Sequence, residues 1–255
     1  ATLKQEWRDG DFLVVDQTIL GLHPELKKIA SENFWLVDNG EDSKSYQGVM
    51  PLFDRLIEGG FRKNHRLIAV GGGITQDVAA FIASILYRGV EWLFFPTNVL
   101  TQCDSCIGSK TSINFKQFKN QLGGFYPPSA VYIDTHFATT LGEREIASGL
   151  GEMLHYFLIS SEADLALFLQ HAPIILEGGK GLETLMHRSL EIKKAMIEID
   201  EFDQGPRNVF NYGHSFGHAL ESATDYAIPH GTAVSYGIDL ANLVSVRLGL
   251  LPMAG

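Results

Sequence analysis

Residues 66–77 read RLIAVGGGITQD and set the fold class of the first half of the chain. The apolar run at 66–70 is typical of a buried strand, and residues 77–87 after the glycines favour a helix. The same alternation of short apolar runs and helical stretches fills residues 11–95. Strands that alternate with helices pair in parallel, so this half is predicted to be an α/β layer fold.

The pattern changes after Asp134, where strand signals nearly vanish and helical periodicity takes over. We therefore predict two domains, residues 1–135 and residues 136–255, the second of them all-α. The expected strands are residues 11–15, 34–37, 66–70 and 92–95, with helices at 25–31, 50–58 and 77–87. In the second domain the expected helices are residues 146–160, 163–170, 182–199, 210–224 and 232–248.

The composition argues against several classes of protein. A net charge of -10 argues against a nucleic-acid or acidic-membrane partner, which would favour a basic face. The longest apolar stretches are shorter than a membrane helix requires, and the first ten residues hold no signal-peptide core. With only two cysteines no disulfide framework is implied, so a cytoplasmic protein is expected.

Gly71, Gly72 and Gly73 form a strand-to-helix turn of a kind that can bind a nucleotide. Glycines let backbone amides approach a diphosphate, and the N-terminal end of the following helix is electropositive. The turn lacks the GxGxxG pattern, and a plain tight turn explains the glycines alone equally well. Its place in a parallel α/β region favours a nucleotide site.

A histidine cluster in the second half predicts a site for a catalytic divalent metal. His214 and His218 lie four residues apart, so a helix places both on one face. His230 starts the next helical segment and can fold back toward them, while Glu152 supplies a carboxylate on an apolar helix. Each histidine alone is better explained as a core or surface residue. The set together favours a metal, because imidazoles with a carboxylate and an open position are its usual ligands.

The segment from Asp104 to Asn120 is rich in lysines and small polar residues. Such residues suit phosphate or carboxylate binding. From charge alone, an ordinary solvated loop is the better interpretation.

Cys103 and Cys106 form a CxxC pair within the same segment. A thioredoxin-like redox pair or half of a structural zinc site would have this spacing. The chain holds no second CxxC, so we interpret both cysteines as packing residues beside Asp104.

Taken in order, these segments resemble the dehydroquinate synthase family of sugar-phosphate cyclases. The similar segments are GGGITQDVAAFIAS, YRGVEWLFFPTNVLTQCDSCIGSKTSIN, KNQLGGFYPPSAVYIDT, GEREIASGLGEMLHY and RNVFNYGHSFGHALE followed by PHG. They extend over most of residues 30–250. The resemblance implies an α/β N-terminal nucleotide-binding domain that takes NAD and an all-α C-terminal metal-binding domain. It also implies a chain shorter than the family at both ends.

The resemblance assigns roles to individual residues. The implied ligands of a zinc or cobalt ion are Glu152, His214 and His230. The implied NAD-binding residues are Asp16, Glu41, Lys44, Gly72, Gly73, Asp77, Thr97 and Asn98. The implied catalytic and substrate-binding residues are Asp104, Lys110, Lys119, Asn120, His155, Lys194, Arg207, Asn211 and His218. Arg88 is implied to reach the phosphate site of a partner subunit, which predicts a homodimer.

The implied reaction is that of a lyase in aromatic amino-acid biosynthesis, the shikimate pathway. A phosphorylated seven-carbon keto-acid, DAHP, would be converted into 3-dehydroquinate and phosphate. NAD would oxidise one hydroxyl transiently while the metal polarises its oxygen. Phosphate then leaves, the hydride returns, and an intramolecular aldol step closes the carbocycle. The residues around the anion contribute mainly by positioning it, so that the phosphate itself accepts the proton.

Four positions depart from the family pattern: Gln76, Asn98, Ser109 and His155. His155 replaces a lysine three residues after Glu152, on the same helix face, and a neutral imidazole binds an anion less firmly. A cyclase acting on sedoheptulose 7-phosphate or glucose 6-phosphate is therefore an alternative, although Arg207 and Asn211 fit a carboxylate-bearing substrate.

Two further classes of protein are alternatives to a cyclase. An NAD- and metal-dependent polyol dehydrogenase would share the domain plan without needing the lysines of the phosphate-binding segment. A catalytically inactive homologue would be expected to lose a metal ligand, whereas all three are present here.

Overall fold

The computed structural model describes residues 2–252, which divide into two compact units. The first unit holds the residues up to Thr97 together with Gly108–Asp134, and the second holds Asn98–Ile107 and the residues from Thr135 onward. The sequence pattern predicts one boundary near residue 135. In the structure the segment Asn98–Ile107 also joins the helical unit, because Val99 and Cys103 pack into its apolar core.

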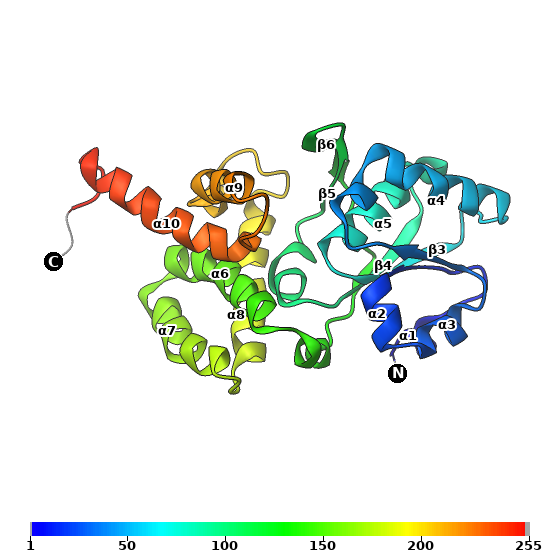
Figure 1. The fold of residues 1–255 in the computed structure, drawn as a ribbon, viewed down its shortest axis with the longest axis horizontal. Helices are drawn as coiled ribbons and strands as arrows, with labels where there is room; N and C mark the ends of the chain where they lie inside the picture. The colour runs from blue at the N-terminus through cyan, green and yellow to red at the C-terminus, as the bar shows by residue number, and fades with distance from the viewer. Residues whose placement is uncertain (1, 253–255) are drawn as a thin grey trace. The chain divides into compact units, whose positions relative to one another are not determined.

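A five-stranded parallel sheet forms the centre of the first unit (Figure 1). Its strands are β1 (Phe12–Asp16), β2 (Phe34–Val37), β3 (Arg66–Gly71), β4 (Glu91–Pro96) and β7 (Ala130–Val131). They lie in the order β2-β1-β3-β4-β7. The predicted α/β class is therefore confirmed. In this order β1 and β3 are neighbours, so the chain reverses its direction of progress across the sheet between them.

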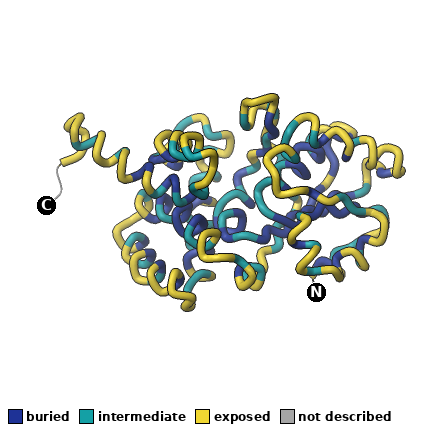
Figure 2. Tube along the Cα trace, in the orientation of Figure 1, coloured by how far each residue is buried: buried dark blue, intermediate teal, exposed yellow. Residues whose placement is uncertain are grey.

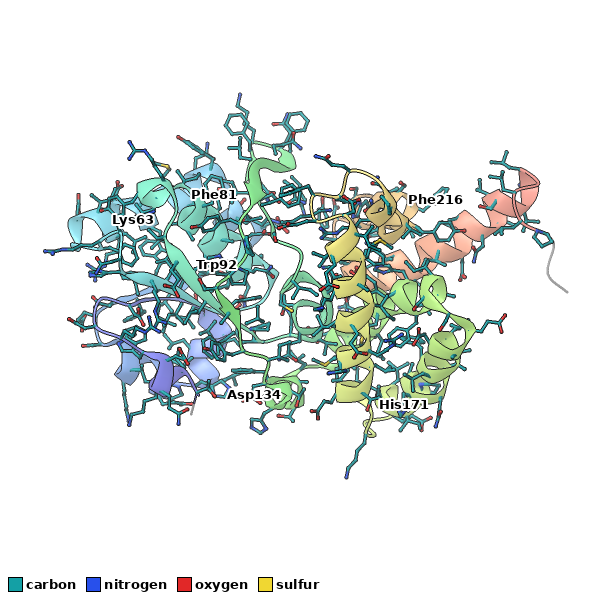
Figure 3. The ribbon with its side chains drawn as sticks, turned by 180° about the vertical axis from the view of Figure 1, so that it is seen from behind. Lys63, Phe81, Trp92, Asp134, His171 and Phe216 are labelled. Carbon is teal, nitrogen blue, oxygen red and sulfur yellow. The ribbon has the colours of Figure 1, made fainter. Side chains whose placement is uncertain are left out.

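Helices and short turns complete this unit. They are α1 (Thr2–Glu6), α2 (Gln17–Leu22), α3 (Glu25–Ala30), η1 (Glu41–Lys44), α4 (Tyr46–Glu58), α5 (Gly73–Ile85) and η2 (Leu86–Arg88). The residues of β3 are all buried, and so is most of α5 (Figure 2). Phe81 of α5 and Trp92 of β4, labelled in Figure 3, belong to this core. The buried run of β3 explains why residues 66–70 lack a polar alternation.

A two-stranded antiparallel hairpin replaces the loop that the sequence predicted after residue 108. It consists of β5 (Lys110–Phe115) and β6 (Phe118–Phe125). The loop interpretation is wrong, because polar residues such as Lys110, Ser112 and Asn120 are interspersed through both strands and conceal the strand pattern. On one face of β5 Thr111 and Ile113 are buried, and this strand packs against α5.

Helices and short helical turns are the only regular secondary structure of the second unit within the residues that the structure describes, as predicted. Its elements are η3 (Thr101–Ser105), η4 (Thr135–Thr140), α6 (Glu143–Ser160), α7 (Glu162–Leu176), α8 (Leu182–Ile199), η5 (Pro206–Asn211), α9 (His214–Ala223) and α10 (His230–Arg247). The helix predicted at 210–224 starts at His214 instead, since Gly213 has a left-handed φ of 82° that separates it from η5. None of the described helices is long and apolar enough to cross a membrane.

Candidate functional site

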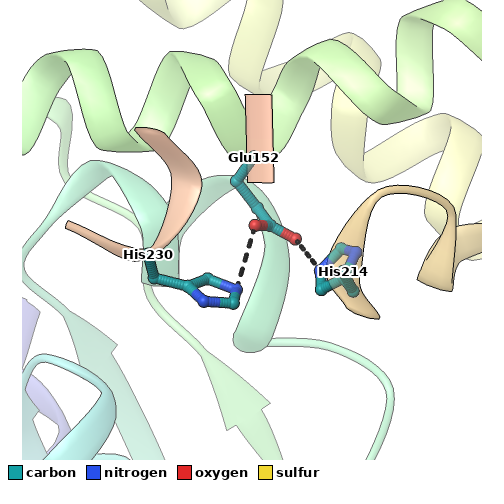
Figure 4. Close-up of side chains that lie close together, drawn as sticks. All are labelled: Glu152, His214 and His230. Atoms are coloured by element: carbon teal, nitrogen blue, oxygen red, sulfur yellow. Dashed lines mark ion pairs between the residues drawn. The ribbon is translucent and has the colours of Figure 1, made fainter. Parts of the chain in front are cut away.

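Glu152, His214 and His230 come together inside the helical unit (Figure 4). Glu152 lies in the middle of α6, while His214 and His230 are the first residues of α9 and α10. The Nε2 atom of His214 is 3.6 Å from Glu152 Oε1, and the Nε2 atom of His230 is 3.4 Å from Glu152 Oε2. All three possible ligand atoms lie within 4.8 Å of one another. One carboxylate and two imidazoles in this arrangement suit a divalent metal such as zinc.

Two glycines allow α6 and α10 to approach closely enough to form this cluster. A Cβ atom on Gly231 would lie 1.8 Å from the carbonyl oxygen of Ser148, and one on Gly151 would lie 2.2 Å from the carbonyl oxygen of Gly231. The Gly231 backbone N–H donates to Ser148 Oγ at 3.1 Å. Each glycine is next to a member of the cluster, Glu152 or His230, so this backbone contact fixes the distance between carboxylate and imidazole.

The carboxylate of Glu152 is held in its ionised form, although it is buried. Burial raises the pKa of Glu152, but the neighbouring His214 and His230 outweigh this effect and hold the pKa well below its usual range. Burial lowers the pKa of His230, whereas Glu152 and Glu221 raise it, to about 10 overall. Glu152 Oε2 and His214 Nδ1 are buried without a hydrogen-bond partner. An ionised carboxylate that attracts a positive partner and leaves acceptors unused fits a metal ion.

His155 lies beside this cluster, one helical turn after Glu152 on α6. Its side chain is 1% exposed, and its Nδ1 atom is 3.7 Å from Glu152 Oε1. The ring packs against Tyr156, Phe210 and His214, with centroid distances of 4.0, 5.9 and 5.2 Å. Burial lowers the pKa of His155 although Glu152 and Asp104 oppose the shift. The expectation that His155 shares the face of Glu152 is confirmed.

A second polar cluster in the helical unit centres on Asp104. This residue lies in the π-helical turn η3, a geometry that is frequent at functional sites. Tyr156 donates a hydrogen bond to its carboxylate, and Lys193 Nζ donates both to Oδ1 at 2.6 Å and to the backbone carbonyl at 2.7 Å. Burial and the charges of Asp104 and Glu152 raise the pKa of Tyr156 well above its usual range.

The buried lysine of this cluster is Lys193, which the sequence analysis missed in favour of Lys194. The side chain of Lys193 is 7% exposed, whereas that of Lys194 is 68% exposed and pairs with Glu198 at 2.5 Å. Adjacent residues on a helix point about 100° apart, so Lys193 and Lys194 face different sides of α8. The apolar periodicity of α8 could have revealed this, because Lys193 lies on the buried side with Ser189 and Met186.

The remaining predicted residues of the helical unit lie in separate places. Arg207 is buried, and its Nη1 donates to the Glu201 carbonyl at 2.6 Å. Asn211 is exposed, with its amide 3.4 Å from Asn208 Oδ1. Asn98 accepts a hydrogen bond from the Thr101 N–H at 2.9 Å. Only His218 lies against the metal cluster, its ring centroid 5.6 Å from that of His214 and 5.5 Å from that of His230.

In the first unit, the predicted nucleotide turn lies at the carboxyl ends of β1 and β3. Parallel α/β sheets bind ligands at such a switch point, where neighbouring strands connect in opposite directions. Asp16 ends β1 and caps α2 by accepting from the Thr18 and Ile19 N–H groups at 2.7 and 3.2 Å. A Cβ atom on Gly73 would meet nothing within 4 Å, so the backbone there is open to a ligand.

The residue that follows β4 holds this glycine turn in place. Thr97 is buried, and its N–H donates to the Gly71 carbonyl at 3.1 Å. Gly72 lies between this anchored residue and the first turn of α5. The predicted residues Asp16, Gly72, Gly73 and Thr97 thus share one end of the sheet.

An ionic network connects η1, α5 and the hairpin of the first unit. Lys44 Nζ pairs with Asp77 Oδ2 at 2.6 Å, and Lys119 Nζ pairs with Glu41 Oε1 at 3.1 Å. Burial raises the pKa of Asp77 despite its Lys44 partner. Asn114, which the sequence analysis missed, donates to Glu41 Oε2 at 2.8 Å.

The hairpin carries the other predicted anion-binding residues. Asn114 Oδ1 accepts from the Asn120 backbone N–H at 3.0 Å, which joins Asn120 to the network of Glu41. Lys110 is exposed at the start of β5. Arg88 is also exposed, and its φ of 62° places it in the left-handed region.

Cys103 and Cys106 are buried, unbonded thiols in the helical unit. Burial raises the pKa of Cys103 well above its usual range and that of Cys106 to about 12. A thiol with a raised pKa is a poor nucleophile. The packing interpretation therefore fits better than a redox pair.

We predict that His155→Leu stabilises the metal-free protein by about 1 kcal/mol, because neither ring nitrogen has a hydrogen-bond partner and a buried unsatisfied polar group is costly. Urea unfolding with metal chelated measures the change. His187→Leu is the control, since its side chain is 74% exposed, and it should leave the free energy of unfolding nearly unchanged. A clear loss of stability in His155→Leu would contradict this account.

Comparison with known proteins gives a consistent family assignment. Residues 34–148 match the family model described as 3-dehydroquinate synthase N-terminal, and residues 149–255 match 3-dehydroquinate synthase C-terminal. A 3-dehydroquinate synthase of Streptococcus pyogenes is 36% identical over 245 residues, which cover 94% of this chain and 68% of the relative.

Solved structures of sugar-phosphate cyclases have the same fold. A 2-epi-5-epi-valiolone synthase from Streptomyces hygroscopicus, with NAD+ and Zn2+ bound, has a TM-score of 0.84 at 28% identity, covering 95% of this chain and 71% of its own. A 2-deoxy-scyllo-inosose synthase complexed with carbaglucose-6-phosphate, NAD+ and Co2+ has a TM-score of 0.80 at 25% identity, covering 95% and 68%. On the family matches and this shared fold, the chain belongs to the 3-dehydroquinate synthase family of cyclase enzymes.

Proposed function

We propose that this chain is the NAD- and metal-dependent lyase of its family, converting the phosphorylated seven-carbon keto-acid DAHP into 3-dehydroquinate and phosphate. The observation that carries the proposal is the cluster of Glu152, His214 and His230 within a chain of this family. When bound, NAD would accept and return a hydride while the metal polarises the reacting oxygen.

The two cofactors have separate candidate sites. Glu152, His214 and His230 would hold a zinc or cobalt ion, the ions bound by the two structural neighbours. Both neighbours also bind NAD+. The glycine turn Gly71–Gly73 would bind the NAD diphosphate through its backbone amides, and Asp16 at the end of the adjacent strand would contact the nucleotide.

The other residues that the resemblance assigns to NAD are proposed to act around this turn. Asp77 and Lys44 form one ion pair and Glu41 and Lys119 another, so a bound nucleotide would exchange partners within an existing network. Thr97 supports the turn from β4 through its bond to Gly71. Asn98 is proposed as a further contact of the nucleotide.

Anion binding is proposed for the basic and amide side chains. Lys110, Lys119 and Asn120 on the hairpin offer exposed or half-exposed donors. In the helical unit Arg207, Asn211 and His218 are the proposed substrate contacts, and the Asp104–Lys193 pair keeps a charged amine beside a carboxylate. Donors of this kind contribute by positioning an anion so that the substrate's own phosphate accepts the proton, and positioning would then supply much of the rate.

His155 bears on which phosphorylated substrate the chain takes. His155 is neutral and buried where a second cation would strengthen binding of a carboxylate-bearing substrate. Sedoheptulose 7-phosphate or glucose 6-phosphate is therefore the runner-up substrate. The neighbour complexed with carbaglucose-6-phosphate supports including a hexose phosphate in the test.

We expect purified protein with NAD and zinc or cobalt to release phosphate from DAHP and to yield 3-dehydroquinate, identified by mass spectrometry. His214→Ala should lower this rate by about 1000-fold, since metal polarisation contributes several kcal/mol. A chelator should abolish the activity, and added metal should restore it.

Parallel assays with the other sugar phosphates and with a polyol distinguish the alternative activities. Release only from sedoheptulose 7-phosphate or glucose 6-phosphate would reassign the substrate and make His155 part of the change. NADH that accumulates from a polyol, without phosphate release from any of the three substrates, would indicate a polyol dehydrogenase. NAD binding without any turnover would contradict the lyase proposal.

We predict that Lys193→Met lowers kcat by at least about 100-fold, whereas Lys194→Met leaves it within about twofold. The reason is that Lys193 is buried with Asp104, while Lys194 is an exposed partner of Glu198, and exposed ion pairs contribute little. Steady-state phosphate release measures both variants. Equal effects, or the reverse order, would return the assignment to Lys194.

We also propose that the active form is a homodimer in which Arg88 serves the phosphate site of the partner subunit. The exposed side chain and left-handed backbone of Arg88 support a constrained functional position. Sedimentation velocity should give twice the 28.2 kDa chain mass, and Arg88→Ala should reduce turnover without changing that mass. A monomer with full activity would rule out the proposed role of Arg88 in a homodimer.

A further inference from the structure

Both ring nitrogens of His230 face a carboxylate. Nε2 is 3.4 Å from Glu152 Oε2, on the side of the metal cluster, and Nδ1 is 3.1 Å from Glu221 Oε2 on the opposite side. The Glu221 side chain is 13% exposed and that of His230 is 32% exposed, so the contact is largely shielded from water. The sequence analysis assigned no role to Glu221.

The contact at Nδ1 decides which nitrogen is available to a metal. To bind a metal, His230 has to give up one of its two ring protons, and a carboxylate that accepts from Nδ1–H keeps the proton on that nitrogen. The lone pair then lies on Nε2, the atom that faces Glu152. Metal-ligating histidines commonly have such an outer carboxylate, which fixes both the tautomer and the ring direction.

The backbone around Glu221 is held in place by its own contacts. Gly217, four residues earlier on α9, lies against α10, where an added Cβ atom would be 3.0–3.2 Å from backbone atoms of Val234 and Ala233. After the helix, the Tyr226 N–H donates to the Glu221 carbonyl at 2.8 Å. The His230 ring is thus held from two helices, by Glu152 of α6 and by Glu221 of α9.

We propose that Glu221 is a positioning residue of the metal centre, which keeps His230 in the Nδ1–H tautomer and directs Nε2 toward the ion. This inference rests on the proposed metal dependence and adds a residue outside the ligand set. Another arrangement of the same atoms would be a second cation site made of His218, Glu221 and His230. The direct contact between Nδ1 and Glu221 and the exposure of His218 favour the positioning role.

The test is zinc and cobalt affinity, measured by competition with a chromophoric chelator on the whole chain. Glu221→Ala should weaken affinity by about 10–100-fold, the usual effect of losing an outer carboxylate. Glu221→Gln should fall between wild type and Glu221→Ala, because its amide oxygen still accepts from Nδ1–H without the negative charge. Asp239→Asn is the matched control, since Asp239 is exposed on α10 and the charge change is the same.

Two further readouts separate positioning from plain stability. The thermal midpoint of metal-free Glu221→Gln should stay close to wild type, and its cobalt absorption spectrum should keep the wild-type shape with one ion per chain. If Glu221→Ala does not fold, the zinc and cobalt affinities of Glu221→Gln and Glu221→Asp are measured in its place. Affinities equal to that of Asp239→Asn would overturn the inference.

Metal stoichiometry distinguishes the remaining outcomes. Two ions per wild-type chain, with one lost in both Glu221→Gln and His218→Ala, would replace positioning by a second cation site. A wild-type chain that binds no zinc or cobalt, or binds it equally after His214→Ala, would overturn the proposed function together with this inference. Binding that depends on His214 but is indifferent to Glu221 would overturn the inference alone.

Discussion

The close backbone contact between α6 and α10 is the constraint on which the helical unit depends. Gly151 and Gly231 leave no room for a side chain between Ser148, Glu152 and the start of α10. Because of this approach, a buried carboxylate in the middle of one helix meets an imidazole at the first residue of another. A buried carboxylate needs compensating partners, and the ring nitrogens of the two histidines that face it, or a bound cation, supply them.

The same close approach of α6 and α10 accounts for the residues that surround the metal cluster. His155 follows Glu152 by one turn and fills the space toward Tyr156 and Phe210, while Glu221 holds the outer nitrogen of His230. The carboxylate of Glu152 is therefore surrounded by imidazoles that have different partners.

The α/β unit depends on a different feature, the order of its strands. With β1 and β3 adjacent, Asp16 and the turn Gly71–Gly73 lie at one edge of the sheet although they are some fifty-five residues apart in the chain. The ion pairs of Lys44 with Asp77 and of Glu41 with Lys119 then connect η1 and the hairpin within this unit. The sequence analysis gave no role to Asn114 or Lys193, because a residue that supports a site through hydrogen bonds is recognised only from its contacts.

The sequence by itself determined the fold class, the helical second half and the residues of the metal cluster, because periodicity and residue type are local properties. It did not predict the hairpin, since polar residues interspersed through both strands conceal the strand pattern, and it selected Lys194 where the buried lysine is Lys193. Only the tertiary structure decided which carboxylate supports His230 and which lysine meets Asp104. Such contacts depend on helix rotation and on the approach of distant backbones, which packing sets and local sequence does not encode.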